Sequence, residues 1–245
     1  MAGPWLAGAR ALGRGLAAAA RGGLAGGGAG RAGAAGGGGG RARGAAGGAG
    51  GGMGGFGGGG GAFQSLPSPA ELDRIVKLET LLPKPAVQVA DVWSKYHEDE
   101  SKGRVGSTLS ASHFSRLAAN AKESPIFLLP VPKPGGFLSL LVQCQLPRLL
   151  VTTVEEYRRS PIDAVSHLTL TYYTELSTSK GLVLVRGDLL TRDHLDPFEA
   201  KAVVKQIHHY YTDPKAYRNQ VWKFNHNTAA WSFTDFLNEL GYKSG

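Results

Sequence analysis

Hydrophobic residues begin to recur regularly near residue 63, and their spacing is helical at first. Ser68 can cap a helix that has Pro69 at its first position and Glu71 completing a capping box, so one helix is predicted to run from there to Pro83. The same spacing recurs later in the chain. Further helices are predicted around Val89–Tyr96, over 110–123, after a cap at Asp196, and over 232–240.

Apolar runs between these helices predict strands. The predicted strands cover 103–109, 125–131, 137–145, 149–157, 167–176 and 181–189, with a short extended piece at 221–225. A five-residue connection at 132–136 joins two of them as a hairpin, and 167–176 pairs with 181–189. Because strands and helices do not alternate as in nucleotide-binding folds, the pattern predicts an α+β domain with a mostly antiparallel sheet flanked by helices.

The stretch SPIFLLPVPKPGGF, residues 124–137, places two prolines at the end of an apolar run. Proline has no backbone donor, and the N–H groups of residues two apart in a strand point the same way. Pro130 and Pro132 therefore remove donors from one side of this strand, which predicts a sheet edge or a strand end. Such an edge either prevents edge-to-edge pairing or offers an apolar surface to a partner, and the sequence leaves both open.

Residues 1–62 differ from the rest of the chain in composition. They hold 29 of the 37 glycines and six arginines, but no lysine and no acidic residue. Such a segment buries too little apolar surface to offset its ordering entropy, so we expect a disordered leader followed by a single domain at 63–245. Arg10, Arg14 and Arg21 share one side of an amphipathic helix, which predicts a mitochondrial transit peptide, with a chloroplast transit peptide as the alternative.

Charge and cysteine content narrow the class of protein. The formal net charge is +8, but without the six leader arginines the domain carries 21 basic against 19 acidic residues, a net charge of +2. The domain therefore has no global basic excess that would indicate nucleic acid. Cys144 is the single cysteine, which excludes an internal disulfide, and its apolar strand predicts a structural thiol. No apolar run reaches the roughly 18 residues of a spanning helix.

Motifs for catalysis are weak in this sequence. The glycines of the domain match neither of the common phosphate-binding loops, and one cysteine excludes a cysteine-based zinc site. His208 and His209 are adjacent, so on a helix they point about 100° apart. The polar loop from Asp188 to Asp196, with His194, is the remaining place for an enzyme site. The sequence therefore predicts a protein that is not an enzyme, without cofactor, metal or small-molecule substrate.

Aromatic residues are concentrated in the C-terminal half, where several are adjacent in sequence. Neighbours on a strand point to opposite faces, so about half of such residues are expected to point outward. Outward aromatic residues are either scattered on the surface or part of an interaction patch. Together with the Arg/Gly-rich leader they support an alternative, an organellar RNA-binding protein.

Four motifs in order resemble the family of assembly factors for the catalytic head of mitochondrial ATP synthase, the chaperones of its β subunit. VWSKYH (92–97) is similar to a helix ending I-W-x-x-Y, and SPIFLLPVPKPGGF is similar to P-x-F-x-x-P-L-P-R-x-x-G-Y-E. LTYYTELSTSKGLVLVRGDL (170–189) is similar to L-x-H-Y-x-E-L followed by K-G-I-V-L, and KFN (223–225) precedes a short C-terminal helix. The resemblance covers roughly residues 66–240.

Three positions depart from the motifs of that family. Lys133, Phe137 and Tyr172 stand where the family has arginine, tyrosine and often histidine. Lysine cannot make the two parallel hydrogen bonds that arginine makes to a carboxylate.

The resemblance implies a non-enzymatic chaperone of the mitochondrial matrix, or of the chloroplast stroma if the leader addresses a plastid. Its partner would be the unassembled β subunit of ATP synthase, without nucleic acid and without stable membrane insertion. The motif residues that become candidates for partner binding are Phe127, Pro130, Pro132, Lys133, Phe137, Tyr172, Tyr173, Glu175, Leu176, Phe224 and Asn225.

Overall fold

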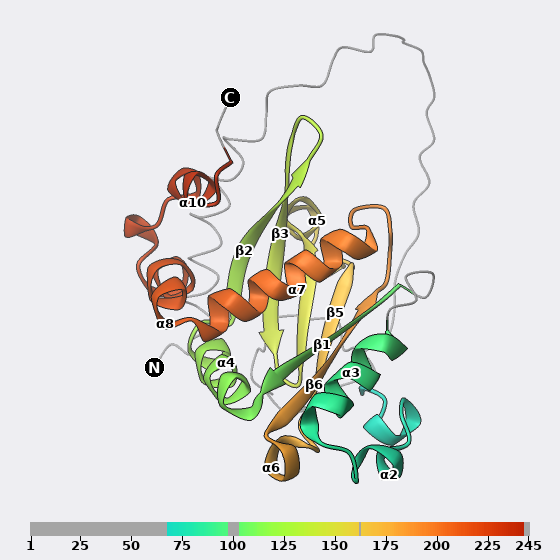
Figure 1. Ribbon diagram of the computed structural model, residues 1–245. Coiled ribbons are helices and arrows are strands. Elements are labelled where there is room, and N and C mark those ends of the chain that lie inside the picture. The colour runs from blue at the N-terminus through green and yellow to red at the C-terminus, as the bar shows by residue number, and fades with distance from the viewer. Residues whose placement is uncertain (1–67, 98–102, 162, 243–245) are drawn as a thin grey trace, which may run out of the picture.

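The computed structural model describes residues 68–97, 103–161 and 163–242. Within these ranges the chain forms a six-stranded antiparallel sheet flanked by helices (Figure 1), which confirms the predicted α+β class. The leader predicted over 1–62, with its transit peptide and its disorder, lies outside the described residues.

The sheet follows the order of the chain except for its first strand. Its strands are β1 (Arg104–Ser110), β2 (Ile126–Lys133), β3 (Gly136–Gln145), β4 (Arg148–Thr153), β5 (Leu168–Tyr173) and β6 (Leu182–Leu189). They are arranged β1-β6-β5-β4-β3-β2, and each neighbouring pair is antiparallel. The first strand therefore pairs with the last, while β2 forms the opposite edge.

Helices precede, interrupt and follow these strands. They are η1 (Leu72–Arg74), α2 (Leu78–Leu81), α3 (Ala86–Tyr96), α4 (Ala111–Glu123), α5 (Val154–Arg159), α6 (Ser177–Lys180), α7 (Pro197–Thr212), α8 (Pro214–Ala216), the π-helix η3 (Tyr217–Trp222), α9 (Lys223–His226), η4 (Thr228–Ala230) and α10 (Phe233–Glu239).

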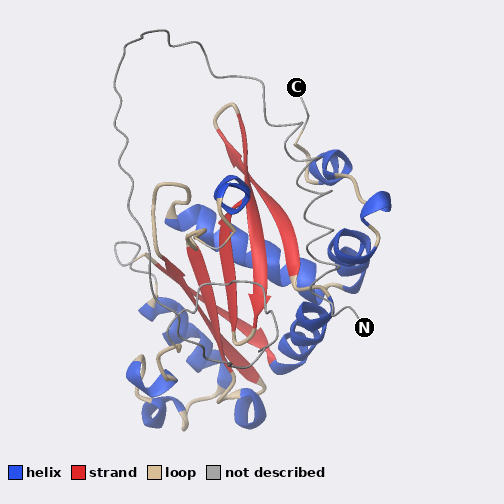
Figure 2. Cartoon of the chain, turned by 180° about the vertical axis from the view of Figure 1, so that it is seen from behind, coloured by secondary structure: helices blue, strands red, loops and turns tan. Residues whose placement is uncertain are grey.

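Helix α7 crosses one face of the sheet, and it begins as the sequence predicts (Figure 1). The Asp196 carboxylate accepts the N–H of Glu199, and the Glu199 carboxylate accepts the N–H of Asp196, which is a complete capping box. Figure 2, the view from behind, shows the strands in front of this helix. Its predicted inner residues are all buried in the main core: Ala200, Val203, Val204, Ile207 and Tyr211.

Two adjacent tyrosines on β5 show that helices cover both faces of the sheet. The Tyr172 ring lies 5.4 Å from Phe114 of α4, and the Tyr173 ring lies 6.1 Å from Trp93 of α3, measured between centroids. Successive side chains of a strand point to opposite faces, so α4 and α3 lie on opposite faces. The Trp93 indole N–H also donates to the Val185 carbonyl at 2.9 Å, which fixes α3 to the sheet.

The single helix predicted over 69–82 is wrong, because two short turns, η1 and α2, replace it. Glu71, rather than Ser68, precedes the first turn, and the Glu71 side chain makes no capping hydrogen bond. The Asp73 carboxylate instead accepts the N–H of Leu78 at 3.1 Å and so starts the second turn. Both turns bury a leucine in a smaller core beneath α3, and this packing outweighs the continuous helical pattern.

The strand predicted over 149–157 ends early. The Thr153 hydroxyl accepts the N–H of Glu156 at 3.2 Å and caps α5, so the second half of this segment is helical. Thr-x-x-Glu is the spacing of a capping box. That spacing is the local signal for the helix start.

The extended piece predicted at 221–225 is also wrong, since η3 and α9 make this segment helical. The Asn225 side chain donates to the carbonyl of Val221, one turn earlier, at 2.8 Å. Val221 and Phe224 are fully buried. Aromatic and β-branched residues favour extended backbone only weakly, and burial against the sheet overrides that preference here.

The hairpin between β2 and β3 is tighter than the five-residue connection predicted at 132–136. The two strands stay paired as far as Lys133 and Gly136, which leaves Pro134 and Gly135 as the turn. Gly135 has a φ of 81°, a left-handed conformation that glycine adopts without strain.

Candidate functional site

The proline-containing strand β2 is an edge of the sheet, as predicted. The N–H of Cys144 on β3 donates to the Pro125 carbonyl at 2.7 Å, whereas the Ile126 carbonyl accepts from the Asn225 side chain at 2.6 Å. Hydrogen-bonding direction alternates along a strand. At Pro130 and Pro132 the backbone nitrogen therefore points away from β3, toward the open edge of the sheet. Neither proline has the N–H donor that a further strand on this side would require.

The end of β2 is attached to helix α7 by a charge pair. The Lys133 ammonium lies 2.6 and 2.7 Å from the two carboxylate oxygens of Glu199. Lys133 therefore already has a carboxylate partner within the chain. Beside it, Pro132 is exposed, and the partly buried Phe137 ring lies 5.6 Å from Phe233 of α10.

Most of the predicted partner-binding residues lie in the core. The buried ones are Phe127, Pro130, Tyr172, Tyr173, Leu176, Phe224 and Asn225. Pro132 and Glu175 are exposed, and Lys133 and Phe137 are partly exposed. Of the eleven predicted residues, only these four have side chains that are open to contact with a partner in this conformation.

The aromatic residues of the C-terminal half do not divide into inward and outward halves. Their buried members include Tyr172, Tyr173, Tyr210, Tyr211, Tyr217, Phe224, Trp231, Phe233 and Phe236. Tyr172 and Tyr173 on β5 are both buried because helices cover each face of the sheet. Tyr210 and Tyr211 are both buried in helix α7. Trp222 is partly exposed, and the Arg218 guanidinium stacks on its ring at 3.6 Å. Because most of these aromatic residues are buried, they give less support to the RNA-binding alternative. The Arg/Gly-rich leader, its other support, lies outside the described residues.

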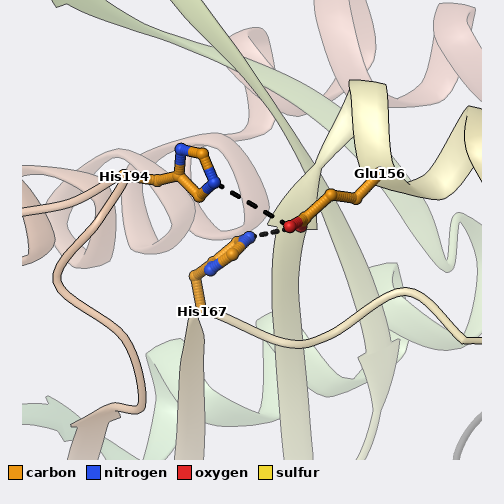
Figure 3. Close-up of side chains that lie close together, drawn as sticks. All are labelled: Glu156, His167 and His194. Atoms are coloured by element: carbon orange, nitrogen blue, oxygen red, sulfur yellow. Dashed lines mark hydrogen bonds and ion pairs between the residues drawn. The ribbon is translucent and has the colours of Figure 1, made fainter.

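A second group of side chains converges at one end of the sheet. Glu156 in α5, His167 just before β5 and His194 in the loop before α7 offer ligand atoms that all lie within 4.8 Å of one another. Figure 3 shows the two imidazole rings directed at the carboxylate. His167 Nε2 is hydrogen-bonded to Glu156 Oε2, and His194 Nε2 lies 3.8 Å from Glu156 Oε1.

Hydrogen bonds outside this group hold it in place. The Thr191 hydroxyl lies 2.6 Å from His167 Nδ1, and the Thr153 hydroxyl donates to Glu156 Oε2 at 3.1 Å. Burial by itself would raise the pKa of the Glu156 carboxyl, but the hydrogen bond from His167 and the proximity of His194 bring that pKa below its usual value. The carboxylate is therefore held ionised beside two imidazoles.

Of these three residues, only His194 was a candidate in the sequence. His194 entered as part of the Asp188–Asp196 loop, but Asp188 is bound by Arg186 at 2.6 Å, and Asp196 caps α7. Glu156 was not a candidate, although the Thr153-x-x-Glu156 capping signal places it in the first turn of a helix just after β4.

Cys144 is a buried thiol, and burial raises its pKa to about 12. The thiol is therefore protonated at neutral pH, as expected for the structural cysteine that the sequence predicts. In the described ranges 68–97, 103–161 and 163–242, no helix combines the length and hydrophobicity needed to cross a membrane.

Comparison with known proteins assigns the family. A family model described as ATP11 protein matches residues 63–237. The chain belongs to the ATP11 protein family. This membership confirms the resemblance found in the sequence.

Relatives of this ATP11 family chain carry a common name. The Homo sapiens protein named ATP synthase mitochondrial F1 complex assembly factor 1 is 26% identical over 170 residues, which is 69% of this chain and 51% of the relative. Proteins of the same name from Mus musculus and Danio rerio are 25% and 23% identical over 170 residues, covering 69% of this chain and 52% and 55% of their own lengths. The chain spans about half the length of the curated relatives it matches.

The four motifs of the resemblance meet in pairs in this ATP11 fold. Trp93 of the first motif packs on Tyr173 of the third at 6.1 Å, and Phe127 of the second packs on Phe224 of the fourth at 5.9 Å. These four aromatic residues are buried, so part of the sequence signal that marks the family is core packing.

Proposed function

We propose that this protein is an assembly factor for the F1 part of ATP synthase and acts as a chaperone in the mitochondrial matrix. It binds the free catalytic β subunit, keeps that subunit from aggregating, and releases it to the α subunit. The observation that carries the proposal is membership of the ATP11 family, whose curated relatives are named for assembly of the mitochondrial F1 complex.

Simple thermodynamics supports such a role. A subunit of an obligate assembly exposes an apolar interface of about 2,000 Å² or more before its partner arrives, and a surface of that size aggregates unless it is covered. A chaperone that covers the surface with lower affinity than the final partner is displaced by mass action. Release then requires no ATP hydrolysis by the chaperone, in keeping with a sequence that lacks a phosphate-binding glycine loop in the domain.

The contact surface proposed here is the end of the β2–β3 hairpin with the first turn of α7. The bond between Lys133 and Glu199 brings these elements together, and Phe198, next to Glu199, is 77% exposed. Pro132 is exposed and Phe137 is partly exposed at the hairpin end. An exposed aromatic residue beside prolines that cannot extend the sheet offers side-chain contacts without strand pairing.

The proposal is tested by diluting denatured ATP synthase β subunit into buffer with and without this protein. We expect the protein to lower light scattering and to form a complex that elutes as one species in size-exclusion chromatography. Unchanged scattering together with no detectable complex would rule out the chaperone role.

Matched variants then test the contact surface. Phe198→Ser is expected to weaken the complex by about 10-fold or more, as for an aromatic residue at the centre of an interface. Val87→Ser is the control, since Val87 is 81% exposed but lies on α3. Equal affinities of the two variants for the β subunit would exclude the proposed surface while leaving the chaperone role intact.

A further inference from the structure

We propose that Glu156, His167 and His194 bind a divalent transition-metal ion, with Zn²⁺ as the ion that fits best. The three residues come from separate segments: the first turn of α5, the residue before β5, and the loop that leads into α7. Their ligand atoms lie within 4.8 Å of one another. A bound ion would link these three segments at one end of the sheet (Figure 3).

The distances require only small side-chain movements. Zinc binds imidazole nitrogen and carboxylate oxygen at about 2.0–2.2 Å in a tetrahedron, so its ligand atoms lie about 3.3 Å apart. His194 Nε2 lies 3.8 Å from Glu156 Oε1, and His167 Nε2 is already in contact with the other carboxylate oxygen. An ion seated between them would replace the hydrogen bond that now joins His167 to Glu156.

The surrounding hydrogen bonds suit metal ligands. A histidine that binds a metal through Nε2 usually donates its Nδ1 proton to a fixed acceptor. Thr191 provides that acceptor, with its hydroxyl 2.6 Å from His167 Nδ1. The Thr153 hydroxyl, 3.1 Å from Glu156 Oε2, restrains the carboxylate in the same way.

Burial leaves one side of the site accessible. The His167 side chain is 3% exposed, while Glu156 and His194 are 29% and 39% exposed. Three protein ligands with an open side leave room for water as the fourth ligand and for entry of the ion. Two imidazoles with one carboxylate suit zinc and its first-row neighbours, whereas Mg²⁺ and Ca²⁺ prefer oxygen ligands alone.

The other interpretation of this cluster is a histidine–carboxylate hydrogen bond that only stabilises the fold. Metal titration separates the two. The full chain, freed of metals with a chelator, is titrated with Zn²⁺ in a calorimeter and with Co²⁺ in a spectrophotometer. We expect one ion per chain, a visible Co²⁺ absorption band of four-coordinate intensity, and no comparable binding of Mg²⁺.

The key variants are His194→Ala and Thr191→Val. His194→Ala removes a ligand from a partly exposed loop and should weaken Zn²⁺ binding by about 100-fold or more. Thr191→Val keeps all three ligands but removes the acceptor for His167, and should weaken binding by about 10- to 100-fold. His113→Ala, at an exposed histidine of α4, is the control that should bind as the unaltered protein does.

Two results would overturn the proposal. One is Zn²⁺ binding by the unaltered chain no tighter than that of folded His194→Ala, with circular dichroism confirming the fold. The other is a six-coordinate Co²⁺ spectrum that all three variants share. Either result would leave the cluster as a hydrogen-bonded pair with a neighbouring histidine, and neither bears on binding of the ATP synthase β subunit.

Discussion

The ammonium group of Lys133, at the end of β2, contacts both carboxylate oxygens of Glu199 in the first turn of α7, at 2.6 and 2.7 Å. The same carboxylate accepts the N–H of Asp196 at 2.9 Å. Glu199 therefore completes the capping box of the long helix and also holds the end of the edge strand. The pair connects two elements that lie far apart in sequence and that together form the proposed contact surface.

Breaking this pair should be measurable. Lys133→Ala is expected to lower the free energy of unfolding by about 1–2 kcal/mol, because the charged hydrogen bonds are only partly exposed to water. A double-mutant cycle with Glu199→Ala, followed by urea denaturation, isolates the coupling energy. The control pair, Arg159 and Glu155, is 74% and 83% exposed and should couple by at most about 0.5 kcal/mol. Equal coupling in both pairs would contradict the assigned role.

The prolines of β2 should protect the protein from self-association. Replacing Pro130 and Pro132 with threonine restores two outward N–H donors on an edge strand, so we expect dimers or larger species in multi-angle light scattering. Pro134→Thr, in the hairpin turn, is the control that leaves the edge unchanged. A double variant that stays monomeric but loses affinity for the β subunit would show that the prolines are contact residues instead.

His208 should make stability depend on pH. Burial lowers its pKa to about 4, from 6.5 for an ordinary histidine. Between these pH values the unfolded chain binds a proton that the folded chain does not, so the free energy of unfolding falls as the pH drops from about 6.5 to 4. The contribution of His208 to this fall is about 3 kcal/mol.

The variant His208→Leu isolates that contribution. Urea denaturation at pH 7 and pH 4.5 should show a smaller loss of stability for this variant than for the unaltered protein. His209→Leu, at the exposed neighbouring position, is the control for removing a histidine from α7. If both variants lost stability on acidification as the unaltered protein does, His208 would not be the source of the dependence.

Lys180 should hold the N-terminal helices against the sheet. Its ammonium donates to the carbonyls of Leu82 and Lys84 at 2.7 and 2.6 Å, just after α2. Lys180→Ala leaves these carbonyls without that donor, so amide hydrogen exchange is expected to rise about 10-fold over 78–89. Lys84→Ala is the control, because Lys84 takes part through its carbonyl. Unchanged exchange over 78–89 in Lys180→Ala would show that packing alone holds this segment.

Several features of the fold could be predicted from short sequence patterns of a few residues. The start of α7 follows from Asp196, Pro197 and Glu199, whose capping bonds close over one turn. The edge position of β2 follows from Pro130 and Pro132, because a missing N–H is a property of the residue itself. Family membership was also accessible from the sequence, since the four motifs keep their order and spacing.

Other elements depended on contacts with residues far away in the sequence, which the local sequence does not reveal. The segment 221–225 is helical because Val221 and Phe224 pack against the sheet, and Asn225 reaches the Ile126 carbonyl at 2.6 Å. Leu176 became a candidate for partner binding because it matches a motif of the family, but the structure buries it in a core with residues of α2 and α3. An apolar pattern alone does not distinguish a residue that packs inside from one that binds a partner.

The sequence by itself determined the α+β class, the cap of α7 and the edge strand β2, whose prolines lack N–H donors. These features depend on capping hydrogen bonds and on the spacing of apolar residues, both of which involve only a few neighbouring residues. Only the tertiary structure decided that Lys133 meets Glu199 and that Glu156 meets His167 and His194. These contacts depend on strand order and on which face each helix covers. Strand order and helix placement are selected by the free energy of burying the whole core. No short segment determines that free energy by itself.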